Sequence, residues 1–229
     1  MRCIEMRAGV KTQNRGKILV SDFDGTMTEH DFFRVALSHL PLGAAAPWEL
    51  YEQGLTSHFA ALATIFSGLR INEQELNALM EEMQVESGLT DALDRLHQFG
   101  WSLVIASAGC AFYIERILLQ AGITAVIHAN PGSFVPGHGL FMKPPGQSPF
   151  FATATGIDKA AVVRHYLGRG INVAFAGDGR PDLPPALLVP PERRFARGWL
   201  ADELKSRSEP FIRFSRWSDI ADNLCGGDA

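Results

Sequence analysis

The sequence of 229 residues contains little cysteine, no long apolar run and no excess of positive charge. Its three cysteines, Cys3, Cys110 and Cys225, are widely spaced and odd in number, which argues against a disulfide framework and against a thiolate metal site. No uncharged apolar stretch approaches the ~20 residues of a membrane-spanning helix. Residues 1–17 also hold no apolar segment typical of a secretory signal. We therefore expect a cytoplasmic protein that has no membrane partner.

The balance of charged residues argues against nucleic acid as a partner. The chain has 21 basic against 25 acidic residues, a formal net charge of −4, so it has no electrostatic footprint for nucleic acid. The hydrophobic fraction of 46% is too high for a disordered chain. At roughly 150 residues per domain, the length allows one large domain or a core that carries a smaller insertion.

Short apolar runs that end at glycine or polar turn residues predict buried strands. These runs are residues 17–22, 101–106, 123–129 and 172–176. Helical patterns occupy residues 112–120 and 158–167 between them. Buried strands that alternate with helices are typical of an α/β protein, and we expect a Rossmann-like, mostly parallel sheet.

The stretch between the first two strands differs, because it holds helical patterns and no convincing strand. The patterns cover residues 31–39, 47–53, 57–67, 73–83 and 90–99. Ser57 and Asn72 are expected helix caps, and Glu75 follows Asn72 at capping-box spacing. The last of these helices leads into the second strand. We therefore predict a small inserted α-helical cap at residues 29–88 and a core made of residues 1–28 and 89–229. A hairpin is expected at residues 131–142.

The strongest chemical signal is Asp22-Phe23-Asp24-Gly25-Thr26, which lies where the first strand meets its turn. Ligands of open α/β sheets bind at the carboxyl ends of the strands, so both carboxylates are expected in one crevice. One carboxylate could act as a nucleophile while its neighbour carries a proton. The glycine lets the backbone approach a ligand closely, and the amides that follow can cradle an anion.

Polar residues at three later points strengthen this signal. Ser107 follows the second strand, and Lys159 lies in the first turn of a predicted helix, where a cation is unfavourable without an anionic partner. Asp178 and Asp182 follow the fourth strand in Gly-Asp-Gly-Arg-Pro-Asp. They face one crevice if Pro181 opens a helix there. Clustered carboxylates favour a hard divalent cation such as Mg²⁺ over zinc.

Taken in order, the segments 22–26 and 177–182, with Ser107 and Lys159 between them, resemble the haloacid dehalogenase superfamily of aspartyl-phosphate phosphatases. The helical insertion resembles the subgroup that contains phosphoserine phosphatases and the methionine-salvage phosphatases of hydroxyketo-methylthiopentenyl phosphate. The segments 107–110, 113–114, 194–197 and 200–204 are similar to the methionine-salvage branch.

The resemblance implies a role for each motif residue. Asp22 would be the nucleophile that forms a phosphoaspartyl intermediate, and Asp24 the general acid and base. Mg²⁺ would be held by the Asp22 carboxylate, the Asp24 carbonyl and Asp178, while Asp182 would be either a ligand or an orienting residue. The phosphate group would be bound by Gly25, Thr26, Ser107, Ala108 and Lys159.

The substrate is expected to be a small phosphate ester, selected by the cap and the hairpin. Candidate specificity residues are His30, Asp31, Phe32 and His138. Between residues 53 and 69 the only basic side chain is His58, which disfavours phosphoserine, because its carboxylate would be buried without a cation. Aromatic residues of the insertion suit an apolar-tailed, sugar-like phosphate somewhat better.

Several alternatives remain open at this point. Arg34 or Arg70 could pair with a substrate carboxylate, so a phosphoserine or phosphocholine phosphatase is one alternative. A phosphotransferase or mutase could use the same covalent intermediate. A catalytically idle binding protein could share the fold, since fold does not determine function. The sequence is compatible with a monomer or a homodimer.

Overall fold

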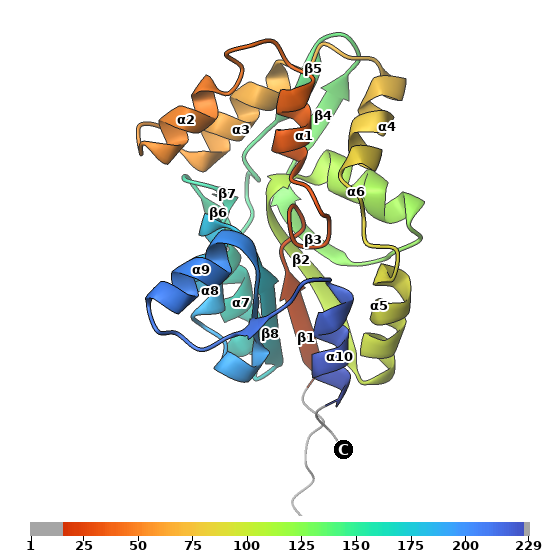
Figure 1. Cartoon of the computed structure of the whole chain (residues 1–229), viewed down its shortest axis with the longest axis vertical. Coiled ribbons are helices and arrows are strands. Elements are labelled where there is room, and N and C mark those ends of the chain that lie inside the picture. The colour runs from red at the N-terminus through yellow and green to blue at the C-terminus, as the bar shows by residue number, and fades with distance from the viewer. Residues whose placement is uncertain (1–15, 227–229) are drawn as a thin grey trace, which may run out of the picture.

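The computed structural model describes residues 16–226 and confirms the Rossmann-like, mostly parallel sheet (Figure 1). Its six strands run in the order β10-β9-β8-β1-β2-β3, and every neighbouring pair is parallel. The strands are β1 (Lys17–Ser21), β2 (Trp101–Cys110), β3 (Val126–Asn130), β8 (Asn172–Gly177), β9 (Arg194–Ala196) and β10 (Ile212–Arg213).

Helices cover both faces of this sheet, because successive side chains of a strand point to opposite faces. In β1, Leu19 packs into one apolar cluster and Val20 into the other. One face carries α7 (Lys159–Leu167), α8 (Leu183–Ala186) and α9 (Gly198–Ser206), and the other carries α5 (Leu89–Gln98), α6 (Ala111–Gln120) and α10 (Ser218–Gly226) (Figure 1). The sheet is thus buried on both faces, as its apolar strands predict.

Four helices lie between β1 and α5, as the sequence predicts. They are α1 (Phe32–Ser38), α2 (Ala46–Glu52), α3 (His58–Ser67) and α4 (Glu73–Glu82). The side chain of Ser57 caps α3 by accepting the amide of Ala60 at 3.1 Å. Asn72 and Glu75 form the predicted capping box at the start of α4. An isolated bridge between Thr28 and Val85 brings the two ends of this helical stretch together.

The predicted hairpin consists of β4 (Gly132–Val135) and β5 (Gly139–Met142), which are antiparallel. It packs against the end of α3. A Cβ added at Gly139, where φ is +132°, would lie 2.5 Å from the carbonyl oxygen of Ser67. The guanidinium group of Arg70 donates to the carbonyl of His138. A second short ladder joins β6 (Phe151–Ala152) and β7 (Gly156–Ile157).

Strand lengths differ from the prediction at one important place. The expected end of β2 at residue 106 is wrong, because the strand continues to Cys110 with a register shift against β3 between Ala106 and Cys110. Ser107 therefore lies in an irregular part of a strand and not in a turn. Such irregularities re-aim side chains near active sites.

Two other expectations concern the membrane and the cysteines. None of the helices within residues 16–226 is long and apolar enough to cross a membrane. Cys110 is buried and Cys225 is half-buried, and neither forms a disulfide. Cys3 lies outside the described residues.

Candidate active site

The order of the strands creates a crevice beside β1. The chain passes from β1 to β2 and β3, and then returns to the other side of β1 with β8, β9 and β10. Ligands of open α/β sheets bind where the order reverses, at the carboxyl ends of the strands. Asp22 directly follows β1 and Asp178 directly follows β8. A cavity of about 400 Å³ opens at this point.

Three carboxylates meet at the floor of the cavity. Asp22, Asp178 and Asp182 each offer an oxygen, and these atoms all lie within 4.8 Å of one another. Burial and the charge of Asp182 raise the pKa of Asp22 well above its usual value, and they raise the pKa of Asp178 to about 7. Oxygen ligands that repel one another in this way suit a hard divalent cation, which would offset their charge.

Lys159 is buried within this cluster. Its Nζ atom lies 2.8 Å from Oδ1 of Asp22 and 2.6 Å from Oδ1 of Asp182, and its side chain is only 2% exposed. Burial alone would lower the pKa of Lys159, but the charges of Asp182 and Asp22 outweigh burial and raise it. These two partners explain a lysine in the first turn of α7, which the helix dipole disfavours.

Asp182 is held on both carboxylate oxygens. Oδ1 accepts from Lys159 at 2.6 Å, and Oδ2 accepts the backbone amides of Asp178 at 3.2 Å and Gly179 at 2.9 Å. Pro181 lies in a short 3-10 helix, η1 (Arg180–Asp182), and this helix brings the Asp182 carboxylate back toward Asp178. Asp182 thereby orients the loop that carries Asp178.

Asp24 occupies a different environment, although it is only two residues from Asp22. Its Oδ2 atom accepts the hydroxyl of Tyr113 at 2.8 Å, and its Oδ1 atom accepts the amide of Phe32 at 3.1 Å. Burial and the charge of Asp31 raise the pKa of Asp24 to about 6, while the bonds from Tyr113 and Phe32 oppose the rise. A carboxyl group that titrates near neutral pH suits general acid and base catalysis.

The hydroxyl of Tyr113 reaches Asp24 because Gly109, which lies between the two groups in space, has no side chain. A Cβ added at Gly109 would overlap the Tyr113 hydroxyl and lie 2.7 Å from Oδ2 of Asp24. The Tyr113 ring stacks on Phe32 with centroids 4.2 Å apart. In the sequence, Tyr113 belongs only to a segment that resembles the methionine-salvage branch, and the resemblance implies no role for it. The helical pattern predicts that Tyr113 is buried, but it does not predict which group its hydroxyl bonds to.

Gly25 and Thr26, in the turn after β1, make contacts other than the phosphate contacts that we expect from the resemblance. The amide of Gly25 donates to the hydroxyl of Thr28 at 3.2 Å, and the amide of Thr26 donates to the carbonyl of Phe23 at 3.2 Å. The hydroxyl of Thr26 donates to Oδ1 of Asp178 at 2.9 Å. Because these groups bond within the turn and to Asp178, Gly25 and Thr26 support the carboxylate cluster and offer no free amide to a phosphate.

Arg197 fixes the same turn from the other side. Its guanidinium group donates to the carbonyls of Gly25 at 2.7 Å, Thr28 at 2.6 Å and Ser215 at 3.0 Å. Residues 194–197 resemble the methionine-salvage branch, but this resemblance implies no role for Arg197. Three backbone carbonyls as partners carry no sequence signal, so this contact could be found only in the structure.

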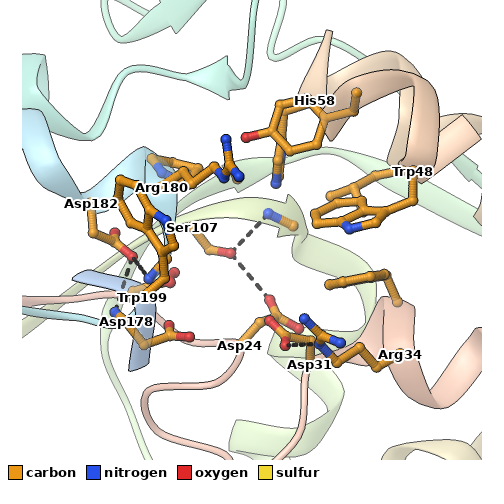
Figure 2. Close-up of a pocket in the computed structure, with 18 of the residues that line it drawn as sticks. Asp24, Asp31, Arg34, Trp48, His58, Ser107, Asp178, Arg180, Asp182 and Trp199 are labelled. Carbon is orange, nitrogen blue, oxygen red and sulfur yellow. Dashed lines mark hydrogen bonds and ion pairs between the residues drawn. The ribbon is translucent and has the colours of Figure 1, made fainter. Parts of the chain in front are cut away.

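The remaining predicted phosphate ligands do face the cavity. Ser107 and Ala108 both line it, and the Ser107 hydroxyl lies 3.4 Å from Oδ2 of Asp24. Figure 2 shows Ser107 between Asp24 and the loop of Asp178 and Asp182. This hydroxyl, in the irregular part of β2, thus lies beside the Asp24 carboxylate in the turn after the neighbouring strand β1.

The candidate specificity residues separate into two groups. Asp31 lines the cavity, where it pairs with Arg34 at 3.1 Å (Figure 2). Phe32 is fully buried and contributes its amide to Asp24, but its side chain does not line the cavity. His30 and His138 are exposed and lie outside the cavity lining. The expectation for both histidines is therefore wrong, because the turn at residue 30 and the packing of the hairpin on α3 keep them away.

Residues 19–186 match the model of the haloacid dehalogenase-like hydrolase family, and the chain belongs to this family. Among curated proteins, a 2-hydroxy-3-keto-5-methylthiopentenyl-1-phosphate phosphatase of Brevibacillus brevis is 24% identical over 210 residues, which cover 89% of this chain and 92% of the relative. A protein of the same name from Microcystis aeruginosa is also 24% identical, over 91% of this chain and 97% of the relative.

Solved structures agree with the fold. A haloacid dehalogenase family hydrolase of Salmonella enterica superimposes with a TM-score of 0.71 at 17% identity, covering 96% of this chain and 75% of that chain. A phosphoserine phosphatase, described as a phospho-aspartyl intermediate analogue, superimposes with a TM-score of 0.63 at 15% identity, covering 90% and 98%. The predicted family and fold class are thus confirmed.

Proposed function

We propose that this chain is a Mg²⁺-dependent phosphatase that hydrolyses a small phosphate monoester through a phosphoaspartyl intermediate. The observation that carries the proposal is the contrast between Asp22 and Asp24. Asp22 lies against Lys159 and the other carboxylates, whereas Asp24 is bonded to Tyr113 and titrates near pH 6. Burial raises the pKa of both groups, but the ion pair with Lys159 favours the anionic form of Asp22, which supports Asp22 as the nucleophile and Asp24 as the proton carrier.

The reaction follows from these two environments. A carboxylate oxygen of Asp22 attacks phosphorus, the bond from phosphorus to the ester oxygen breaks, and the departing oxygen takes a proton from Asp24. Asp24 then takes a proton from water, whose oxygen attacks phosphorus and releases inorganic phosphate and the Asp22 carboxylate. The buried ammonium group of Lys159 offsets the charge on the phosphoryl oxygens.

The metal would be held mainly by Asp22 and Asp178. Both carboxylates lie at the carboxyl ends of adjacent strands, and their raised pKa values reflect burial and uncompensated negative charge. Asp182 accepts bonds from Lys159 and from two amides, which favours an orienting role over direct ligation. A bound Mg²⁺ would supply electrostatic stabilisation of the phosphoryl group.

For the substrate, we propose a phosphate ester like 2-hydroxy-3-keto-5-methylthiopentenyl-1-phosphate. The curated relatives that cover about nine-tenths of the chain carry this substrate in their names. The cavity also ends in aromatic side chains of the helical stretch, including Phe33, Trp48 and Phe66, which suit an apolar tail. Phosphoserine is the second candidate, because Arg34 and Arg180 line the same cavity.

Release of inorganic phosphate tests the proposal. We expect the purified protein to hydrolyse p-nitrophenyl phosphate in the presence of Mg²⁺ and to lose this activity in EDTA. Asp22→Asn should lower the rate by roughly 10³-fold or more, because it removes the attacking carboxylate. Asp94→Asn, an exposed change on α5, serves as the matched control.

The same assay separates the alternatives. A protein that binds phosphate esters but releases no phosphate would support an idle binding role. An isomeric phosphate ester as the product would indicate a mutase. A panel of phosphorylated metabolites that includes the methionine-salvage intermediate, phosphoserine and phosphocholine then identifies the substrate by its kcat/KM.

A further inference from the structure

The end of the cavity opposite the carboxylates is built from rings. Figure 2 places Trp48 and His58 across the cavity from Asp24 and Asp178. The His58 ring contacts Trp48 and Tyr51 edge to face, with centroids 5.5 Å and 5.1 Å apart. Trp48 also stacks on Phe33 at 3.9 Å. The three rings Trp48, Tyr51 and His58 are called the ring subsite below.

His58 has an unmet hydrogen-bonding group in this subsite. Its Nδ1 atom is buried and has no hydrogen-bond partner among the described residues. Buried polar atoms of native proteins are bonded in the great majority of cases, so an unpartnered nitrogen on a side chain that lines a cavity calls for a bound water or ligand group there. Burial and the nearby charge of Lys159 lower the pKa of His58 to about 3. The ring is therefore neutral near pH 7 and offers one donor and one acceptor.

Charged side chains of both signs lie near the ring subsite. Arg34 pairs with Asp31 at 3.1 Å, and Glu52 accepts the indole N–H of Trp48 at 3.2 Å. The exposed guanidinium group of Arg180 lies 5.5 Å from the Trp199 ring, and its charge also acts on Tyr51, where it opposes the charge of Glu52. A ligand group that reaches His58 thus meets a neutral imidazole between aromatic faces, which suits an uncharged group.

We propose that the ring subsite is the specificity determinant of the proposed phosphatase, and that it selects an uncharged leaving group with one carbonyl or hydroxyl bonded to His58 and an apolar part against Trp48 and Tyr51. This inference rests on the proposed function. The inference goes beyond the proposed function, because it assigns recognition of the leaving group to His58, which contacts neither the phosphate nor the carboxylates. Esters with a carboxylate or an ammonium group are disfavoured, because the opposite charges of Arg180 and Glu52 beside the subsite offset each other and Arg34 is paired with Asp31.

The test compares two substrates in one protein sample. The substrates are five-carbon alkyl phosphates with and without one ketone. They are assayed with the wild type, His58→Asn and Trp48→Leu. The control is His39→Asn, which changes an exposed histidine that pairs with Glu82. The ratio of kcat/KM for the two esters does not depend on the folded fraction. We expect the wild type and His39→Asn to prefer the ketone by about tenfold or more, because the alkyl ester leaves His58 unpaired.

The variants should separate the two parts of the subsite. His58→Asn should reduce the ketone preference by about fivefold or more, whereas His39→Asn should keep the wild-type preference. Trp48→Leu should raise KM for both esters and keep their ratio. An unchanged ratio in His58→Asn overturns the inference, as does a wild type that prefers phosphoserine or phosphocholine to the ketone ester. A wild type inactive on every ester contradicts the proposed function itself.

Discussion

Asp22 and Asp24 are neighbours in the sequence, yet contacts from distant segments give them different chemistry. Tyr113, which comes from α6, bonds to Asp24, and Lys159, which comes from α7, bonds to Asp22. The spacing of the motif predicts two carboxylates in one crevice. It does not predict which of them carries a proton, because that depends on partners about 90 and 137 residues away, which only the fold brings together.

The hydroxyl of Tyr113 positions Asp24, so its removal should slow proton transfer. We expect Tyr113→Phe to lower kcat by roughly tenfold or more and to leave KM nearly unchanged, because a hydrogen bond to a carboxylate is lost while the ring remains packed on Phe32. Steady-state kinetics with an ester substrate measure both constants. Tyr166→Phe, a change of a half-buried tyrosine on α7, is the control. Equal effects of the two changes would contradict the assignment.

Lys159 should dominate the stability of the carboxylate cluster. Its replacement by methionine leaves the buried carboxylates of Asp22 and Asp182 without their cation. We expect Lys159→Met to lower the free energy of unfolding by about 3–5 kcal/mol. Urea unfolding of metal-free protein measures the change, with the exposed Lys205→Met as the control. A loss equal to that of the control would show that the ion pairs contribute nothing.

At the scale of elements, the turn after β1 shows how a single backbone position fixes the site. Gly25 has φ of +67°, and an added Cβ would lie 2.6 Å from Oδ2 of Asp178. Gly54 has a similar φ of +74° but no atom within 4 Å of an added Cβ. Substitution by alanine thus strains both backbones, whereas only the change at Gly25 displaces a carboxylate.

This pair of glycines gives a matched experiment. We expect Gly54→Ala to cost about 1–2 kcal/mol in stability, from the left-handed backbone alone, and to keep its kcat/KM. Gly25→Ala should cost more and lower kcat/KM at least tenfold, because Asp178 must move. Thermal unfolding and p-nitrophenyl phosphate hydrolysis measure the two effects. Wild-type activity in Gly25→Ala would mean that Asp178 need not stay where the turn holds it.

Elements with a strong apolar pattern are predicted well from this sequence, and short edge elements are not. The patterns of β1 and β8 predict two central strands, and the capping box at Asn72 predicts the start of α4. By contrast, β9 and β10 span only three and two residues. Such lengths carry no periodicity, and these strands form because the sheet beside them offers unpaired backbone groups.

Site residues follow the same division. The motif residues Asp22, Asp178 and Lys159 meet as predicted, since strand ends converge in a parallel sheet. Residues assigned by nearness in sequence, such as His30 and His138, lie outside the cavity. Nearness along the chain says little about a loop's direction, which depends here on packing between the hairpin and α3.

For the whole molecule, the cluster of buried carboxylates links metal binding to stability. We expect saturating Mg²⁺ to raise the unfolding midpoint by roughly 5–10 °C at a hundredfold excess over Kd. Asp178→Asn should lose most of this shift, because it removes a ligand. Without metal the variant should be at least as stable as the wild type, because repulsion with Asp182 and Asp22 is gone. Thermal scans in EDTA and in Mg²⁺ measure both effects.

The control for this experiment is Asp94→Asn, which changes the net charge equally but lies exposed on α5. It should keep the full response to Mg²⁺. A shift of the same size in Asp178→Asn would place the cation elsewhere on the molecule. A destabilised metal-free Asp178→Asn would indicate that the carboxylate repulsion is compensated within the protein itself.

The bond between Phe32 and Asp24 also links the position of Asp24 to α1. Phe32 begins α1, the first helix that leaves the core, and its amide holds Oδ1 of Asp24. Any outward movement of α1 must either break this bond or carry Asp24 away from the crevice. A movement of α1 that breaks this bond would thus remove one of the hydrogen bonds that hold the Asp24 carboxylate in place. The position of this carboxylate therefore depends on the first helix of the inserted stretch as well as on the turn after β1.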